Sequence, residues 1–154
     1  MSDRCFVDTN ILVYAHDRTN GIKHQRAQKV LEDLWESGKG VLSTQVLQEM
    51  CINLRRKANN PLPVEEVSRL IREYSTWEIV VNSPESVLHA LEIEMRYQTS
   101  FWDALILQAA ETAGASILYS EDLSAGQHYG GIRVVNPLLD PITDPITDPI
   151  TPLE

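Results

Sequence analysis

Four carboxylates in this chain could together hold a divalent cation. Asp8 and Asp103 lie in almost wholly apolar stretches, where an ionised carboxylate needs compensation. Asp122 follows an expected strand, and Glu49 lies in an expected helix. Each acid alone could instead be a helix cap or a solvated residue. As a set they form an all-oxygen donor group, which favours Mg²⁺ or Mn²⁺ over Zn²⁺.

The reaction that matches carboxylate-held Mg²⁺ or Mn²⁺ is hydrolysis of a phosphodiester bond. One bound ion lowers the pKa of an attacking water, and a second can stabilise the leaving oxygen. The sequence offers no evident Ser–His or Cys–His nucleophile pair, which argues against a covalent intermediate. Its two cysteines and four histidines are scattered and form no zinc-binding pattern.

The distribution of charge decides whether nucleic acid is a plausible partner. Taken alone, the net charge of −9 is unfavourable for binding a phosphate backbone. However, residues 140–154 carry −4 and residues 1–139 carry −5, of which the four candidate ligands supply −4. Bound cations would therefore leave a nearly neutral domain that can attract phosphates.

Strands and helices alternate along the chain, which predicts an α/β fold with a mainly parallel sheet covered on both faces. About five short strands are expected, at residues 4–8, 41–42, 77–81, 116–119 and 132–135. Helices are expected at residues 11–15, 23–36, 44–57, 65–74, 84–97 and 100–114. Ligands bind at the carboxyl ends of such strands. Chain order therefore brings three of the four acids towards one edge of the sheet, and Asp103 is compatible with the same edge.

The last part of the chain differs from the rest. Residues 140–151 repeat the unit Asp-Pro-Ile-Thr three times. A proline at every fourth position excludes a helix or a central strand. We therefore expect one domain at residues 1–139, followed by an extended or disordered tail at 140–154. The tail could be a tether, a binding strip or a segment without function.

The composition also bears on the compartment. No apolar run approaches the ~20 residues of a membrane span, and the N-terminus lacks the layout of a signal peptide. Cys5 and Cys51 stand alone in apolar stretches, as expected for reduced thiols. We therefore expect a cytoplasmic protein without membrane contact.

Four segments of the chain, in order, resemble the motifs of PIN-domain ribonucleases. They are Phe6-Val7-Asp8-Thr9-Asn10-Ile11-Leu12, Gln48-Glu49, Phe101-Trp102-Asp103-Ala104-Leu105-Ile106 and Ser120-Glu121-Asp122-Leu123. The resemblance covers about residues 4–139. In its size and in the expected absence of extra domains, the chain looks most like the VapC-like toxins of toxin–antitoxin pairs. This resemblance implies a three-layer α/β/α arrangement.

The resemblance also implies roles for particular residues. In that family four acids bind Mg²⁺ or Mn²⁺ and cleave RNA, which makes Asp8, Glu49, Asp103 and Asp122 metal ligands and catalytic residues. By the same resemblance Thr9 and Ser120 become hydroxyl supports, and Asn10 a further supporting residue or substrate contact. A cognate antitoxin and a homodimer are implied as well. An antitoxin Arg or Lys could enter the acidic site.

Other residues are candidates for contact with RNA. The bases Arg55, Arg56 and Lys57 close one predicted helix and could hold RNA phosphates. The three tryptophans, Trp35, Trp77 and Trp102, are expected in the core rather than on a platform that stacks bases.

Several alternatives use the same residue types. A haloacid-dehalogenase-like phosphatase needs Asp-x-Asp, but residue 10 is Asn; a receiver domain needs a late lysine, but none follows Lys57. Both are thereby weakened. A catalytically silent PIN-like interaction module stays open, as does a housekeeping RNA-processing nuclease without an antitoxin.

Overall fold

The computed structural model describes residues 3–57 and 59–139. The tail expected at residues 140–154 lies outside this range. Across the described residues, no helix combines the length and the apolar composition that a membrane span requires.

A single six-stranded sheet forms the centre of the fold, in the order β3-β2-β1-β4-β6-β5. The strands are β1 (Cys5–Val7), β2 (Gly40–Ser43), β3 (Glu78–Val80), β4 (Ile117–Tyr119), β5 (His128–Tyr129) and β6 (Ile132–Val135). Neighbouring strands are parallel except β5 and β6, which form an antiparallel pair. The predicted α/β class and the mainly parallel sheet are thus confirmed.

The sixth strand was not expected, because β5 is only two residues long. It pairs with β6 across a turn at Gly130 and Gly131, and Gly130 adopts a φ of 63°. Glycine reaches this left-handed conformation without the steric cost that other residues incur. A two-residue strand is too short to show an alternating pattern in the sequence.

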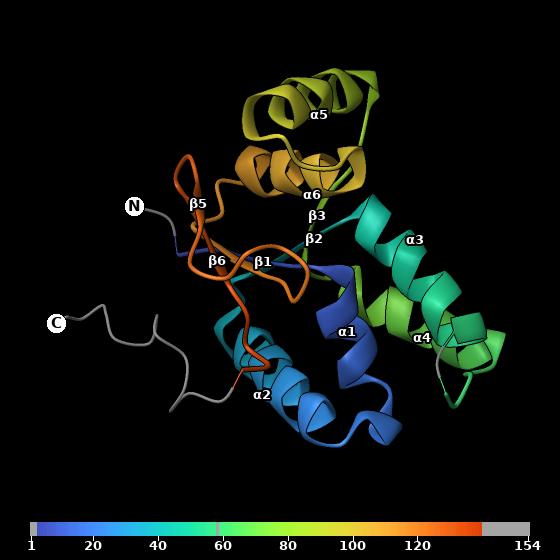
Figure 1. Ribbon diagram of the computed structural model, residues 1–154. Coiled ribbons are helices and arrows are strands. Elements are labelled where there is room, and N and C mark those ends of the chain that lie inside the picture. Colours follow the sequence, from blue (N-terminus) through green and yellow to red (C-terminus); the bar gives the residue numbers. More distant parts are fainter. Residues whose placement is uncertain (1–2, 58, 140–154) are drawn as a thin grey trace, which may run out of the picture.

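Helices cover both faces of the sheet (Figure 1), which completes the three layers. They are α1 (Thr9–Ala15), α2 (Ile22–Ser37), α3 (Thr44–Ile52), α4 (Val64–Tyr74), α5 (Pro84–Tyr97) and α6 (Phe101–Thr112). Helices α5 and α6 lie on one side of the sheet, and α1 to α4 lie on the other. A 3-10 turn spans Arg18–Asn20, and α3 continues into a π-helical segment at Asn53–Lys57.

The core is centred on β1, whose residues are all buried. Phe6 is paired with Val41 of β2 on one side and with Leu118 of β4 on the other. All three side chains are at most 1% exposed. The middle of the sheet is therefore fully buried, and the loops at its carboxyl edge start from buried strands.

The expectation that all three tryptophans are core residues is wrong for two of them. Trp102 is 62% exposed in the first turn of α6, and Trp35 is 43% exposed on α2. Trp35 packs one face on Tyr74 and Trp77, with ring centroids 5.4 and 5.1 Å away, and leaves the rest in solvent. A helical segment buries only the stripe that faces the sheet, and the large size of an aromatic ring does not decide which stripe that is.

Candidate active site

Asp8 is the most buried of the four candidate acids, with 6% of its surface exposed. It follows β1 and caps the N-terminus of α1, since its Oδ1 accepts a hydrogen bond of 2.7 Å from the backbone N–H of Thr9. Its Oδ2 accepts a second bond of 2.9 Å from the hydroxyl of Ser120. The capping role weighed from the sequence is therefore real, and it leaves both oxygens at the carboxyl edge of the sheet.

Ser120 connects Asp8 to the loop that carries Asp122. While the Ser120 hydroxyl donates to Asp8, its oxygen accepts bonds from the backbone N–H groups of Asp122, at 3.1 Å, and Leu123, at 3.3 Å. Ser120 is fully buried directly after β4, the strand that pairs with β1. One hydroxyl thus sets the position of two candidate ligands relative to each other.

Glu49 on α3 is held by two neighbouring side chains. The Thr9 hydroxyl donates to its Oε1 at 2.7 Å, and the Gln45 amide donates to its Oε2 at 3.2 Å. The same Gln45 nitrogen lies 3.4 Å from the backbone carbonyl of Trp102. These bonds join α3 to α1 on one side and to the first turn of α6 on the other.

Asp103 lies in that first turn of α6. Its backbone N–H donates to the hydroxyl of Ser100 at 3.1 Å, so the expected helix cap is present. The negative charge of Asp103 is one of the causes that raise the pKa of Asp122, in the loop after β4. The bond between Gln45 and the Trp102 carbonyl places this first turn of α6 beside α3, the helix that carries Glu49.

Two of the four acids, Asp8 and Asp122, have raised pKa values, chiefly because they are buried or partly buried. Burial raises the pKa of Asp8 to about 6 and outweighs the hydrogen bonds from Ser120 and from the Thr9 N–H, which lower it. The charges of Asp122 and Glu49 add smaller increases. Partial burial also raises the pKa of Asp122, followed by the charges of Asp103, Glu121 and Glu49. The charges of Glu49, Asp103 and Asp122 thus contribute to the raised pKa of Asp8 or of Asp122.

These carboxylates do not form a ready coordination shell. Among residues 3–57 and 59–139, no three His, Cys, Asp or Glu side chains make a group that could hold a metal ion. The metal-ligand roles of Asp8, Glu49, Asp103 and Asp122 therefore stay predictions.

Two buried oxygens beside these residues lack a hydrogen-bond donor among the described atoms: Oδ1 of Asn10, next to Thr9, and Oε1 of Gln45. A buried acceptor without a donor costs free energy. A cation or an ordered water would satisfy such an oxygen. The donor chemistry of this edge therefore fits a hard cation such as Mg²⁺.

A second network that the sequence did not reveal lies beside the site. Glu121, between Ser120 and Asp122, accepts a bond of 2.8 Å from the Tyr14 hydroxyl. Its other oxygen forms an ion pair of 2.6 Å with Lys23, whose ammonium also lies 5.1 Å from the Tyr14 ring centroid. This Tyr14–Glu121–Lys23 network ties the loop of Asp122 to α1 and α2. No spacing in the sequence connects these three residues, although Glu121 is part of the segment Ser120-Glu121-Asp122-Leu123.

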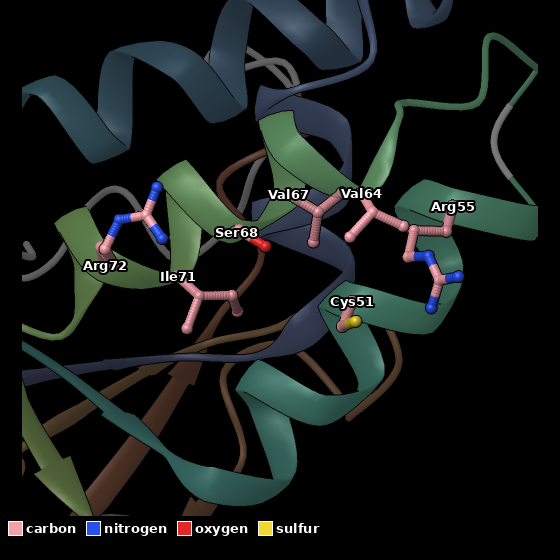
Figure 2. Close-up of a pocket in the computed structure, with 7 residues that line it drawn as sticks. All are labelled: Cys51, Arg55, Val64, Val67, Ser68, Ile71 and Arg72. Carbon is pink, nitrogen blue, oxygen red and sulfur yellow. The ribbon is translucent and has the colours of Figure 1, made fainter.

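The candidate RNA-binding bases are farther from the acids. Arg55 follows Glu49 by six residues, roughly 9 Å along a helix axis. Figure 2 shows Arg55 at one end of an apolar cleft between α4 and the end of α3. Arg56 is exposed on the same π-helical segment. Nothing is described for the side chain of Lys57, so its predicted role lies outside the described atoms.

Comparison with known proteins indicates the family. The sequence model of the PIN domain matches residues 5–127. The fold is similar to the Sarcin-Ricin loop cleaving toxin VapC20 of Mycobacterium tuberculosis, with a TM-score of 0.61, 22% identity, and coverage of 77% of this chain and 89% of VapC20. A toxin–antitoxin complex from Klebsiella pneumoniae gives a TM-score of 0.64 at 21% identity, covering 86% and 97% of the two chains.

DNA-bound VapBC from Salmonella typhimurium gives a TM-score of 0.57 at 18% identity, over 86% of this chain and 96% of that one. At identities of 18–22%, these similarities show a shared fold and nothing beyond it. No curated protein is similar enough to count as a match.

Proposed function

The chain belongs to the PIN domain family, and from this premise we propose that it is a metal-dependent ribonuclease, the toxin of a toxin–antitoxin pair. The observation that supports this most is the buried carboxylate of Asp8, held by two hydrogen bonds within repulsive reach of Glu49 and Asp122. Such clustering opposes folding unless a cation balances it, and perturbed carboxylates of this kind concentrate at functional sites.

In this proposal Asp8, Glu49, Asp103 and Asp122 hold Mg²⁺ or Mn²⁺. A bound ion supplies a water of lowered pKa and stabilises charge on the scissile phosphate. The resemblance to other PIN domains supports the same four residues.

The chain's own groups then keep the acids ionised and oriented. Ser120 and the Thr9 N–H donate to Asp8, and donors to a carboxylate favour its charged form. The Thr9 hydroxyl and Gln45 together use both oxygens of Glu49, which restricts rotation of its carboxylate. Asn10 is proposed as a further support, through its unpartnered Oδ1.

RNA would approach this edge through its phosphates. Arg55, Arg56 and Lys57 are proposed to hold phosphates away from the cut. Lys23 is committed to Glu121 and so offsets one negative charge close to Asp122. The acidic edge would otherwise repel a polyanion strongly.

An antitoxin is the proposed protein partner. The similar structure from Klebsiella pneumoniae is a toxin–antitoxin complex, and a cluster of carboxylates attracts an Arg or Lys side chain. Co-expression with the product of a neighbouring small gene should yield a stable complex without ribonuclease activity. Full activity in that complex would count against inhibition by this partner.

A homodimer is proposed from the outer face of α5. Leu88, Leu91 and Met95 follow one another at helical spacing there and are 62%, 46% and 76% exposed. Exposed apolar side chains that adjoin one another on one helix face can mark an interface. Light scattering should report a dimer for the natural chain and a monomer for Leu88→Glu combined with Met95→Glu. A dimer that survives this double variant would exclude this face.

The experiment that tests the activity uses the purified full chain, freed of any antitoxin. We expect it to cut RNA with Mg²⁺ or Mn²⁺ and to stop in EDTA, while Asp8→Asn and Asp103→Asn fold normally and do not cut. Asp33→Asn is the matched control, because Asp33 is exposed on α2 and pairs only with Lys29 among the described residues. Calorimetric titration with Mn²⁺ adds a readout that is independent of cleavage.

The outcomes also separate the alternatives. Cleavage by either active-site variant at the natural rate would refute the assigned site. Metal binding without cleavage of any RNA would favour a silent interaction module. Cleavage without toxicity on induction would favour a housekeeping nuclease. Sequencing of RNA ends after brief induction would identify the substrate.

A further inference from the structure

The indole of Trp102 is an exposed aromatic surface beside the candidate active site. The residue is 62% exposed in the first turn of α6, whereas all seven residues from Ala104 to Ala110 are buried. Its ring meets that of Phe101 in an edge-to-face contact, with the centroids 5.3 Å apart and an angle of 76° between the ring planes. Phe101 itself is partly buried and packs against the core. Phe101 thus supports the indole, and most of the indole faces solvent.

The main chain of Trp102 is fixed relative to two of the candidate acids. Its Cα lies one peptide unit, about 3.8 Å, from the Cα of Asp103. Its carbonyl lies 3.4 Å from the amide nitrogen of Gln45, which also donates to Glu49 at 3.2 Å. One glutamine side chain therefore joins the backbone of Trp102 to the carboxylate of Glu49. The exposed indole is adjacent to any ligand that these acids bind.

Packing within the chain does not explain this exposed ring. A tryptophan that stays in solvent forgoes the hydrophobic stabilisation that burial of its large apolar surface would bring. A single exposed apolar side chain is ordinary on a protein surface, so exposure by itself assigns no role. The position of Trp102 is the second observation. An aromatic ring beside a cluster of carboxylates offers a flat ligand group a contact that does not depend on charge.

We propose that Trp102 stacks an unpaired base of the RNA, next to the phosphate that reaches the acids. The inference rests on the part of the proposed function that makes RNA the ligand, and it requires no cleavage. Proteins that bind single-stranded RNA stack bases on aromatic side chains, and every base offers a π face to such a ring. In a duplex both faces of a base are already stacked. Trp102 therefore positions an unpaired nucleotide and takes no part in breaking the bond.

A stacking contact also suits the charge of this chain. Residues 1–139 carry a net charge of −5, and attraction of phosphates by arginine and lysine weakens steeply as salt rises. The candidate phosphate contacts Arg55 and Arg56 lie on the π-helical segment that follows α3, a separate element from α6. The indole contacts the neutral base rather than the phosphate. Its contribution to affinity should therefore be nearly the same at about 50 mM and at about 200 mM salt.

The binding test uses the purified full chain in EDTA, so that cleavage does not interfere. The probes are fluorescein-labelled oligoadenylate, oligouridylate and an abasic ribose-phosphate chain, all of equal length. Trp102→Leu should weaken binding of oligoadenylate, measured by anisotropy, about tenfold. This change equals about 1.4 kcal/mol, within the range for one base stacked on an aromatic side chain. Trp102→Phe keeps an aromatic ring and should retain most of the affinity. Neither variant should change binding of the abasic chain.

Trp35→Leu is the matched control, because Trp35 is also exposed but lies on α2, on the other side of the sheet from α6 (Figure 1). It should leave the affinity for all three probes unchanged. Oligoadenylate should quench the tryptophan fluorescence of the natural chain and of Trp35→Leu, but not that of Trp102→Leu. With Mn²⁺ present, Trp102→Leu should raise KM for cleavage of oligoadenylate about tenfold and leave kcat nearly unchanged. Circular dichroism verifies that each variant is folded.

Equal affinities of the natural chain and Trp102→Leu for oligoadenylate would overturn the proposal, and so would a loss that extends to the abasic chain. If Trp102→Leu changes the oligomeric state in light scattering and leaves RNA binding intact, the indole belongs to a contact between protein copies and the proposal is wrong. The nuclease activity fails separately. A chain that binds oligoadenylate through Trp102 but cuts no RNA in Mn²⁺ would refute cleavage and leave the stacking site standing.

Discussion

Asp8→Asn is expected to stabilise the metal-free protein at neutral pH while abolishing cleavage. Asp8 has a pKa of about 6, against 3.8 for an unburied carboxyl, chiefly because it is buried. The folded chain therefore holds this proton more tightly than the unfolded chain. The contribution of Asp8 to stability is therefore fully present below about pH 3.8, is lost as the pH rises to about 6, and does not change above that. A difference of about two pKa units corresponds to about 3 kcal/mol.

The asparagine variant avoids this cost but alters one hydrogen bond. Its single carbonyl can accept from the Thr9 N–H or from Ser120, but not from both, and losing one bond costs about 1 kcal/mol. The net expectation is about 2 kcal/mol of stabilisation at neutral pH, equivalent to a rise in Tm of about 4–8 °C for a domain of this size. Near pH 3.8 the advantage should vanish.

The assay is urea or thermal unfolding in EDTA, followed by circular dichroism at neutral pH and at about pH 4. Saturating Mn²⁺ should stabilise the natural chain and leave Asp8→Asn almost unchanged, because a ligand stabilises only the state that binds it. Asp33→Asn controls for loss of an exposed charge. A variant less stable than the natural chain in EDTA at neutral pH would refute the reasoning, as would the same advantage at both pH values.

Three further expectations follow from other contacts. Burial, reinforced by the charge of Arg69, lowers the pKa of His16 to about 4. The contribution of His16 to stability should therefore be fully present above about pH 6.5 and should be lost, by about 3 kcal/mol, as the pH drops to 4. His16→Gln should remove this dependence in urea titrations at a series of pH values. Glu121→Gln should loosen the Tyr14–Glu121–Lys23 network and weaken Mn²⁺ binding by about tenfold in calorimetry, and an unchanged affinity would show that the network does not position Asp122. A Cβ at residue 40 would collide with the Trp77 ring, so Gly40→Ala should cost about 1–3 kcal/mol in urea unfolding; a variant as stable as the natural chain would show that the ring moves freely.

The sequence alone was sufficient for the class of fold, and it singled out four acids whose roles as metal ligands stay predictions. Continuous apolar strands alternating with helices predict a parallel sheet, because only strands buried on both faces lack polar positions. Asp8 was recognisable as a candidate site residue because an ionised carboxylate inside an apolar run needs a compensating charge or hydrogen bond. The start of α5 at Pro84 was predictable, since Ser83 and Pro84 mark it, and the end was expected at about Tyr97, where the helix does end.

Only the tertiary structure decided how the acids are supported. The bonds from Thr9 to Glu49 and from Gln45 to the Trp102 carbonyl join residues 40 and 57 positions apart, and the network around Glu121 joins three separate elements. The exposure of Trp102 is also a result of packing. Local patterns record which face of an element is apolar, but hydrogen bonds between distant elements depend on the angles and offsets at which those faces pack, and no single segment of the sequence encodes them.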